Sequence, residues 1–440
     1  MRNRAAAIAT TLGSLVLISA TGLTSLAVAA PNAPSSDSSG TSASASIVKN
    51  AVTNPVYSPQ PGVMFNDPTG IPAEQYSMRT HINRSIAATP AGGTIRIATY
   101  TLNFGDSVNA LIAARNRGVK VQVLVDDHVT TPQTAQLTTA LGKNTSAGSF
   151  VKRCSRGCMG GSVGMMHAKL YLFSSAGSSK LVTMVGSANL AYSSQAYSWN
   201  NLQTVVGDKT MYDSSTKYFT DMVKDQANLN YYRTTTSGSQ KAYFFPKSSS
   251  KNSVMLDALN QVTCKGASAG YGYQGRTVIR VAMYHWTSSR LDVATKLRAL
   301  HDQGCVVQVI VNSPIVSSDV MKALLKKSSK YGVMPVYNAL YDRDRDGVAE
   351  QYLHHKVLTI NGKWNGNSRT KVVFNGSQNF TDNSTLKNNE ILYRVSGAAT
   401  YNAYAANLTN IRDNHARKAT NVASASVLSE ADIRKLASED

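Results

Sequence analysis

The sequence predicts an α/β fold of two similar α/β/α-sandwich halves, each with a mixed or parallel sheet, packed about a pseudo-twofold axis. The first observation behind this prediction is internal repetition. Four segments recur in the same order: 95–100 as 279–284, 117–126 as 303–312, 167–169 as 354–356, and 186–189 as 376–379. A shared order over four segments indicates duplication, and 440 residues exceed what one hydrophobic core usually organises.

The second observation is the order of elements within one half. Residues 95–100 and 119–125 are β-branched runs of strand length. Between them, the Ala/Leu-rich stretch from Val108 to Arg117 has a helical pattern and ends at Gly118. A strand, a helix and a second strand of these lengths require a right-handed crossover, so each half is expected to contain parallel strands covered by helices.

The same patterns divide the chain into domains. We expect the first half at 61–233, a Thr/Ser/Gly-rich linker at 234–241, the second half at 242–417 and a C-terminal tail at 418–440. The Ser/Ala-rich residues 31–60 are expected to form a disordered spacer.

Residues 1–30 have the pattern of a signal peptide. Arg2 and Arg4 form a basic start, residues 5–26 are apolar with small side chains, and 27–30 are a small-residue cleavage site. A membrane anchor is the alternative, but Thr and Ser residues interrupt the apolar run and no basic stop-transfer cluster follows. We therefore expect a secreted, extracellular protein.

The four cysteines fit an exported protein. An even count in an oxidising compartment predicts two disulfides, and we expect Cys154 to pair with Cys158 and Cys264 with Cys305. A zinc site of four thiolates is the competing interpretation, but the spacing is poor and no His lies close in sequence to either pair.

The charge balance favours an anionic partner. The formal net charge of +20 becomes +18 when Arg2 and Arg4 leave with the signal peptide. Such an excess suits nucleic acid, an acidic membrane surface or a phosphate-bearing substrate, and it does not choose among them.

Chemistry is expected at the repeated His-x-Lys motifs, His167/Lys169 and His354/Lys356. Both precede apolar runs that resemble strands, in which residues two apart share a face, so each His lies beside its Lys. Attack on a phosphodiester needs a nucleophile and a cation that offsets the phosphate charge. Two facing halves supply two imidazoles, one as nucleophile and one as general acid.

Each motif is followed by a strand that ends in Gly-Ser-x-Asn. The Gly is expected to let the backbone approach a phosphate, and the Ser and Asn side chains to offer uncharged donors. These residues are Ser187 and Asn189 in the first copy, and Ser377 and Asn379 in the second.

With both motifs in place, the chain resembles the phospholipase D superfamily from about Gly62 to Arg417. The hallmark of that family is a duplicated His-x-Lys-x4-Asp motif followed by Gly-Gly/Ser-x-Asn. The Cys-x3-Cys loop and the stretch 243–246 (Tyr-Phe-Phe-Pro) are similar to secreted actinobacterial members. The resemblance implies a phosphohistidine intermediate, no metal or other cofactor, and release of the second product by water or an alcohol.

The resemblance also implies roles for individual residues. His167 would be the nucleophile and His354 the general acid, with Lys169, Lys356, Asn189 and Asn379 binding the phosphate. The motif Asp is Ser174 in the first copy and Asn361 in the second. The family pattern also has an acidic residue, about a dozen positions after Gly-Ser-x-Asn, that orients the histidine. Glu390 occupies this position in the second half, and Asn201 in the first. We therefore hypothesise that His354 has the better oriented imidazole and that the two roles are exchanged.

Two smaller patterns have competing interpretations. Asp342, Asp344 and Asp346 are spaced like the start of a calcium loop, although Leu353 stands where a bidentate Glu belongs, and the interleaved arginines of a solvated loop explain them better. Asp126, Asp127 and His128 follow a strand, where ligands bind in open α/β sheets, although ordinary loop polarity also explains them.

Three functions are consistent with these features. The leading one is a phospholipase D-type enzyme that acts on phospholipid head groups, by hydrolysis or by transfer to an alcohol, at a phospholipid membrane surface and as a monomer. The second is a secreted nuclease, which the net charge favours although no nucleic-acid module is recognisable. The third is a catalytically inactive protein that binds phosphate or lipid.

Overall fold

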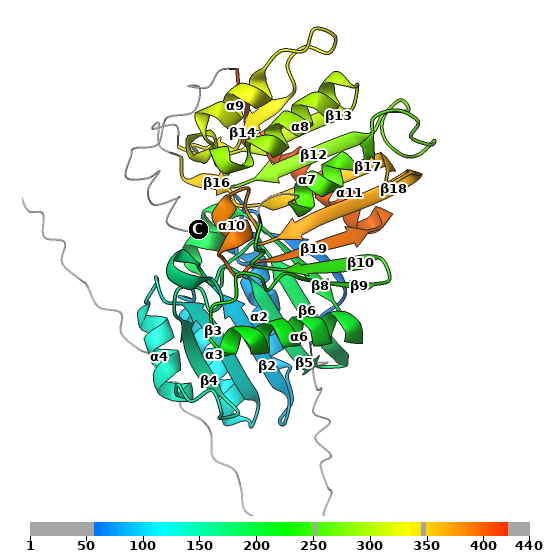
Figure 1. The fold of residues 1–440 in the computed structure, drawn as a ribbon. Helices are drawn as coiled ribbons and strands as arrows, with labels where there is room; N and C mark the ends of the chain where they lie inside the picture. Colours follow the sequence, from blue (N-terminus) through cyan, green and yellow to red (C-terminus); the bar gives the residue numbers. More distant parts are fainter. Residues whose placement is uncertain (1–56, 250–252, 345–348, 421–440) are drawn as a thin grey trace, which may run out of the picture. The chain divides into compact units, whose positions relative to one another are not determined.

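Two sheets with the same strand order form the framework of the molecule. The computed structural model describes residues 57–249, 253–344 and 349–420, all within one compact unit. The first sheet has the order β1-β8-β6-β5-β2-β3-β4, and the second contains the matching run β10-β19-β18-β17-β12-β13-β14 (Figure 1). The second sheet is extended by β9 and β20 at its edges and by β11, which pairs with β17. Matching order in both sheets confirms the predicted pair of similar α/β halves.

The strands of the first sheet are β1 (Gly62–Phe65), β2 (Thr94–Thr99), β3 (Lys120–Asp126), β4 (Phe150–Cys154), β5 (Leu170–Ala176), β6 (Ser179–Gly186) and β8 (Asn201–Val205). Those of the second are β9 (Arg233–Ser237), β10 (Gln240–Phe244), β11 (Val262–Thr263), β12 (Val278–Met283), β13 (Val306–Val311), β14 (Val336–Asn338), β17 (Lys356–Trp364), β18 (Asn367–Gly376), β19 (Ile391–Ser396) and β20 (Arg417–Lys418). A third, small sheet joins β15 (Leu340–Tyr341), β16 (Gln351–Leu353) and β7 (Ser198–Trp199).

Parallel pairing occurs where the sequence predicts a crossover. β2 pairs with β3 and β3 with β4 in parallel, as do β12 with β13 and β13 with β14, whereas the other neighbours in the two large sheets are antiparallel. The predicted crossover helix is α3 (Gly105–Asn116), between β2 and β3. Its counterpart in the second half is α8 (Leu291–Asp302).

The remaining helices are α1 (Pro72–Gln75), α2 (Ser77–Ala87), α4 (Pro132–Leu141), α5 (Tyr192–Ala196), α6 (Lys209–Val223), α7 (Val254–Asn260), α9 (Ser318–Leu325), α10 (Asp382–Leu386) and α11 (Ala398–Asn410). Short 3-10 turns span Gly161–Val163, Ser288–Arg290 and Ser313–Ile315, and a π-helical turn spans Ile411–His415. Among the described residues, no helix combines the length and apolar character that crossing a bilayer requires.

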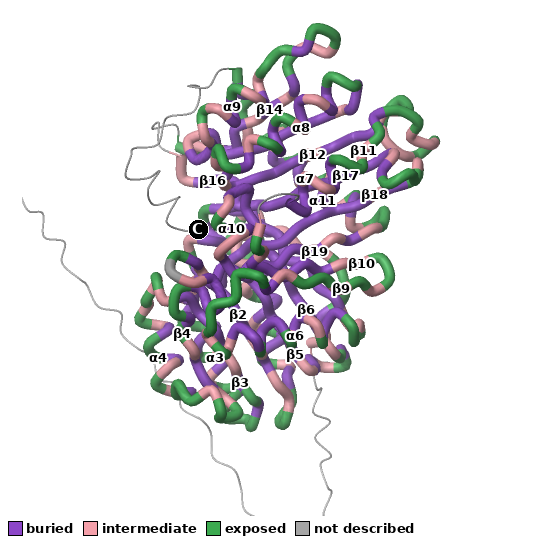
Figure 2. The backbone as a smooth tube through the Cα atoms, in the orientation of Figure 1, coloured by how far each residue is buried: buried purple, intermediate pink, exposed green. Residues whose placement is uncertain are grey.

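Helices cover both faces of each sheet. In the first half, α2, α3 and α4 share one core with the sheet, while residues of α6 join a core on its other face. In the second half, α7, α8 and α9 occupy one core and α11 the other. Figure 2 shows the result, with strands buried and outer helix surfaces exposed. These are the expected α/β/α layers.

The cores on the α6 and α11 faces each contain residues of both halves. The core that includes Tyr218 of α6 also contains Phe244 and Ile391 of the second half. The core that includes Tyr404 of α11 also contains Trp199, and Phe65 packs against it. This reciprocal exchange is what two repeats related by an approximate twofold rotation produce.

The predicted linker is not a loop. Residues 233–237 form β9 and residues 240–244 form β10, an antiparallel hairpin at the edge of the second sheet. The predicted spacer also ends earlier than expected, because the backbone carbonyl of Pro59 accepts a hydrogen bond from Ser179 Oγ at 2.7 Å. The signal peptide at 1–30 lies outside the described residues, as does most of the predicted tail.

Candidate active site

Both His-x-Lys motifs lie at the start of a strand, deep inside the molecule. β5 begins directly after Lys169, and β17 begins at Lys356. All four residues have a relative exposure of 0%. Lys169 Nζ donates to the carbonyl of His167 at 2.7 Å, and Lys356 Nζ donates to the carbonyl of His354 at 3.2 Å. Each ammonium group is thereby held beside the histidine of its own motif.

The histidines are fixed by the opposite half of the chain. His167 N donates to the carbonyl of Asn389 at 3.0 Å, and His354 N donates to the carbonyl of Trp199 at 3.0 Å. The His167 Nδ1 atom lies 2.9 and 3.0 Å from the two Glu390 carboxylate oxygens. These contacts bring residues far apart in the sequence into one site.

The hypothesis that Glu390 orients His354 is therefore wrong. Glu390 contacts His167, and His354 Nδ1 instead lies 2.8 Å from Asn200 Oδ1. The orienting groups cross between the halves because the two repeats face each other. The carboxylate thus supports the histidine of the first motif, which removes the structural reason for exchanging the two roles.

Asn201 is likewise not the counterpart of Glu390. Asn200 follows Gly186 at the same interval at which Glu390 follows Gly376, and this interval was the signal in the sequence that identifies it. Asn201 Nδ2 donates to His355 Nδ1 at 2.8 Å, and its Oδ1 accepts from the Tyr404 hydroxyl at 3.1 Å. Asn201 therefore stabilises the packing around His355 and Tyr404, and it does not orient a motif histidine or face a substrate.

The serines of Gly-Ser-x-Asn also have a role that differs from the expected one. Ser187 Oγ donates to Asn200 Oδ1 at 2.8 Å, and Ser377 Oγ donates to the Glu390 carboxylate. Their hydroxyl protons are thus used to fix the groups that orient the histidines, and the expected donation to a phosphate is not what the structure shows.

The preceding glycines are required by a close strand rather than by a phosphate. A Cβ atom at Gly186 would lie 2.2 Å from the carbonyl oxygen of Asn201, and one at Gly376 would lie 2.2 Å from that of Ile391. Any side chain would therefore displace the neighbouring strand, and with it the residue that orients the histidine.

The asparagines of the two Gly-Ser-x-Asn segments remain candidates for phosphate binding. Asn189 and Asn379 are each 4% exposed, and among the described residues their Oδ1 atoms have no hydrogen-bond partner. Their backbones are fixed by serines, since Asn189 N donates to Ser194 Oγ at 2.9 Å and Ser384 Oγ donates to the Asn379 carbonyl at 2.6 Å. An amide oxygen only accepts hydrogen bonds and a phosphodiester has no donor for it, so phosphate binding by Asn189 and Asn379 would use their Nδ2 protons instead.

Two tyrosines that the sequence did not single out also border the site. Tyr100 and Tyr284 follow β2 and β12, at the ends of matched segments. The Tyr284 ring lies 4.5 Å from the His354 ring and 4.5 Å from Lys356 Nζ, whereas Tyr100 lies 5.8 Å from His167 and 5.9 Å from Lys169 Nζ. Their repetition in both copies of the strand was the available signal.

The residues in place of the motif Asp support the backbone. Ser174 Oγ accepts from Thr94 N at 2.9 Å, and Asn361 Oδ1 accepts from Gly272 N at 3.0 Å. Both lie along strands, several residues beyond the histidines. Their substitution removes no group that contacts a motif histidine.

At the middle position of the second motif, His355 is a buried neutral imidazole. Its Nε2 atom lies 3.0 Å from Asn407 Oδ1, and burial lowers its pKa to about 3. Its first-half counterpart is Ala168, so this histidine belongs to the packing between β17 and α11 and not to the repeated chemistry.

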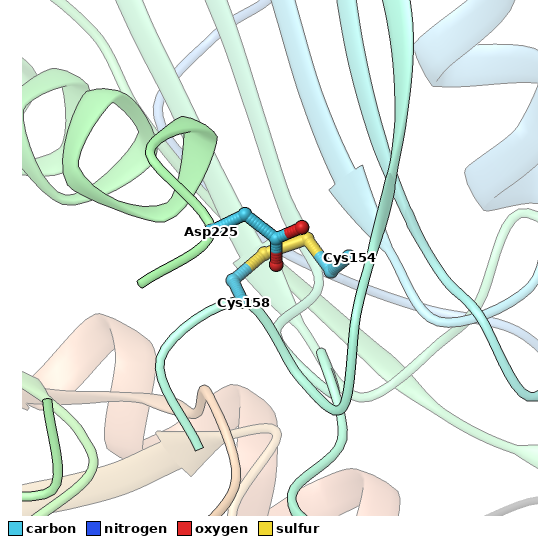
Figure 3. Close-up of side chains that lie close together, drawn as sticks. All are labelled: Cys154, Cys158 and Asp225. Carbon is cyan, nitrogen blue, oxygen red and sulfur yellow. A yellow bond between two sulfur atoms is a disulfide. The ribbon is translucent and has the colours of Figure 1, made fainter. Parts of the chain in front are cut away.

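The cysteines form the expected pairs. Cys154 and Cys158 lie at disulfide distance, as do Cys264 and Cys305, and the described residues contain no free cysteine. Figure 3 shows Asp225, from beyond the end of α6, beside the first pair. Its carboxylate accepts from Ser155 N at 2.9 Å and contacts Lys152 Nζ at 3.0 Å. Sulfur atoms joined in pairs do not provide the thiolates of a zinc site.

Part of the calcium candidate lies outside the described residues, because Asp346 is not among them. Carboxylate oxygens of Asp342, Asp344 and Glu350 lie within 4.8 Å of one another. Glu350 also accepts a hydrogen bond from Arg343 N at 2.6 Å. That contact fits the interpretation of a solvated loop whose acidic groups have local partners.

Comparison with known proteins identifies the family. The model described as "Cardiolipin synthase, PLD-like domain" matches twice, over residues 86–223 and 274–412. The chain belongs to the PLD-like domain family. Both repeats of the fold are covered, which confirms the resemblance to the phospholipase D superfamily, and the PLD-like domain of the first repeat carries His167 while that of the second carries His354.

Solved structures share the fold at low identity. A phosphatidylserine synthase from Haemophilus influenzae Rd KW20 is 11% identical with a TM-score of 0.56, over 86% of this chain and 92% of that one. A polyphosphate kinase from Porphyromonas gingivalis is 14% identical with a TM-score of 0.52, over 86% of this chain and 52% of that one. The chain thus spans about half the length of that kinase. A search among curated proteins finds no match.

Proposed function

We propose that this protein is a secreted phospholipase D-type phosphodiesterase that cleaves phospholipid head groups through a phosphohistidine intermediate. The observation that carries the proposal is the crossed arrangement in which Glu390 supports His167 and Asn200 supports His354. Two buried imidazoles, each oriented by the opposite repeat and each beside an ammonium group, are the groups that double displacement at phosphorus requires.

In the proposed first step, His167 is the nucleophile. Its Nδ1–H donates to Glu390, so Nε2 attacks phosphorus, and the carboxylate stabilises the positive charge that develops on the ring. The P–O bond to the leaving alcohol breaks as the N–P bond forms. His354 gives its Nε2 proton to the departing oxygen while Lys169 and Lys356 offset the phosphate charge.

In the second step, water or another alcohol replaces His167. His354, now neutral, takes the proton of the attacking hydroxyl, the new P–O bond forms and the N–P bond breaks. Water gives phosphatidic acid, and an alcohol gives a new phosphodiester. The chain's own side chains suffice for both steps, so no cofactor is required in this scheme.

The names of related proteins and the net charge of this chain support a lipid substrate. The family description names cardiolipin synthase, and one structural neighbour is named a phosphatidylserine synthase. Both names refer to phospholipids, and the net charge of +20 favours an anionic substrate or surface. Secretion is supported by the signal-peptide pattern and by two cysteine pairs at disulfide distance.

The test compares the purified wild type with a His167→Asn/His354→Asn double variant on phosphatidylcholine vesicles and on single-stranded DNA. We expect head-group release by the wild type and a loss of at least about 10³-fold in the variant. DNA cleavage without lipid turnover would indicate a nuclease instead. Binding of vesicles without turnover of either substrate would indicate an inactive binding protein.

Trapping the intermediate tests the assignment of roles. Brief reaction with phosphatidylcholine labelled with ³²P, followed by acid quenching and peptide mapping, is expected to place the label on His167. Label on His354 would show that the roles are exchanged despite the position of Glu390.

A further inference from the structure

A buried carboxylate holds the chain immediately before the proposed nucleophile. Asp126 is the last residue of β3 and has a relative exposure of 0%. Its Oδ2 accepts a hydrogen bond from Met166 N at 2.6 Å, and Met166 directly precedes His167. A hydrogen bond from a backbone N–H to an ionised group is short and stronger than one between neutral groups.

The opposite side of this segment is fixed by the second half. His167 N donates to the Asn389 carbonyl at 3.0 Å, and Met166 forms a parallel bridge with Asn389. The Met166–His167 segment therefore lies between Asp126 of its own half and Asn389 of the other. Both contacts restrain the backbone from which the His167 side chain extends toward Glu390.

The second repeat has the same arrangement with a different residue. Asn312 occupies the position of Asp126, and Leu353 directly precedes His354. Asn312 Oδ1 accepts from Leu353 N at 3.0 Å, and Asn312 Nδ2 donates to the Leu353 carbonyl at 2.6 Å. In both halves, a side chain at the end of a strand thus accepts a hydrogen bond from the backbone N–H of the residue before the motif histidine. We call this contact the clamp, and its recurrence indicates that it belongs to the site and not to the packing of one loop.

We propose that Asp126 is a positioning residue for His167. Asp126 fixes the peptide group before His167. It thereby sets the distance from His167 Nδ1 to Glu390 and the distance from His167 Nε2 to the phosphorus atom of the substrate. The inference rests on the proposed function, because it takes His167 as the reacting group. Misplacement of a reacting atom by about 1 Å costs on the order of 10²-fold in rate, so a loose segment would be visible in kcat.

The difference between the two clamps predicts which substitutions are tolerated. A carboxylate only accepts hydrogen bonds, so the second oxygen of Asp126 is satisfied by His128, with Oδ1 2.9 Å from the backbone N and 2.5 Å from Nδ1. An amide both accepts and donates, as Asn312 does. Asp126→Asn retains an oxygen for the Met166 N–H but turns its Nδ2 donor toward His128, whose backbone N–H loses its acceptor. Asp126→Ala leaves the buried Met166 N–H itself without an acceptor.

The first test measures kcat and KM on phosphatidylcholine vesicles for Asp126→Ala, Asp126→Asn and the matched control Asp127→Ala. Asp127 is the neighbouring acid, 35% exposed in its side chain. We expect Asp126→Ala to lower kcat by about 10- to 100-fold with little change in KM, Asp126→Asn to recover most of that loss, and Asp127→Ala to match the wild type. An Asp126→Ala variant that folds and keeps its kcat overturns the proposal.

The second test does not need turnover. Hydrogen–deuterium exchange of a peptide that includes Met166 and His167 should be faster in Asp126→Ala and close to the wild-type rate in Asp126→Asn. Unchanged exchange in Asp126→Ala overturns the proposal even if the wild type turns over neither lipid nor DNA, an outcome that would separately refute the proposed function. If Asp126→Ala does not fold, Asp126→Asn decides: retained kcat and exchange support the clamp, and their loss contradicts it.

Discussion

At the scale of single residues, the site is asymmetric although its framework is duplicated. Equivalent positions hold Glu390 beside His167 and Asn200 beside His354, and equivalent serines, Ser377 and Ser187, donate to both. A carboxylate stabilises a positively charged ring, and an amide only orients it. The structure therefore gives the two histidines different environments, as the proposed roles of nucleophile and acid require.

Replacing the carboxylate should be more harmful than replacing the amide. We expect Glu390→Gln to lower kcat by about 10²- to 10⁴-fold, because the ring of His167 loses its charged partner and its fixed tautomer. Asn200→Ala should cause a smaller loss, since His354 keeps its backbone contact with Trp199. The measurement is kcat on phosphatidylcholine for both variants, with thermal unfolding as a check on folding. Equal losses would contradict the asymmetry.

The residues of the candidate site could be picked out in the sequence, but their partners could not. His167, Lys169, His354 and Lys356 stand out because they recur in matched segments, and a repeat is visible along the chain. Which histidine Glu390 contacts depends on how one repeat faces the other. Sequence proximity within a half favoured His354, and only the packed structure places Glu390 against His167.

At the scale of elements, strands and helices with an apolar pattern were predicted correctly, whereas a polar strand was missed. The strands expected at 95–100 and 119–125 are observed as β2 and β3, and the helix between them is α3, which begins slightly earlier than expected. Residues 233–237 form β9, of which 234–237 were predicted as part of a linker. Most side chains of this edge strand are exposed, so it needs no apolar face, and its threonines suit a strand as well as a loop.

A buried histidine connects three elements and predicts how stability depends on pH. His355 precedes β17 and contacts Asn201 of β8 and Asn407 of α11. Burial lowers its pKa from 6.5 to about 3, so between these values the unfolded chain binds a proton that the folded chain excludes. The contribution of this neutral histidine is complete above pH 6.5 and is lost as the pH falls toward 3, at up to about 1.4 kcal/mol per pH unit.

Urea unfolding of the wild type and of His355→Gln over this pH range measures the effect. We expect the variant to be less stable near neutrality, because the buried contacts change, but to lose less free energy of unfolding on acidification. The difference between the two curves isolates His355 from other titrating groups. Parallel curves would show that His355 does not contribute to acid sensitivity.

At the scale of the whole molecule, duplication yields one site instead of two. The groups that orient the histidines are exchanged between the repeats, and so are residues of the cores around Tyr218 and Tyr404. Each half by itself has a histidine without its orienting group. The halves therefore form one structural unit, which agrees with the single compact unit that contains all described residues.

A shared site makes a quantitative prediction for single substitutions. If each repeat held an independent site, His167→Asn or His354→Asn alone would leave about half of the turnover, and their effects would add. In one site, each histidine acts in the same reaction, so we expect either single variant to lose at least about 10³-fold in kcat, with little further loss in the double variant. Steady-state turnover of phosphatidylcholine by the three variants, corrected for folded fraction, distinguishes these cases. In the proposed mechanism His354 is the acid and His167 forms the covalent bond. We therefore expect a residual burst of head-group release from His354→Asn and none from His167→Asn. A burst from His167→Asn would contradict a single nucleophile.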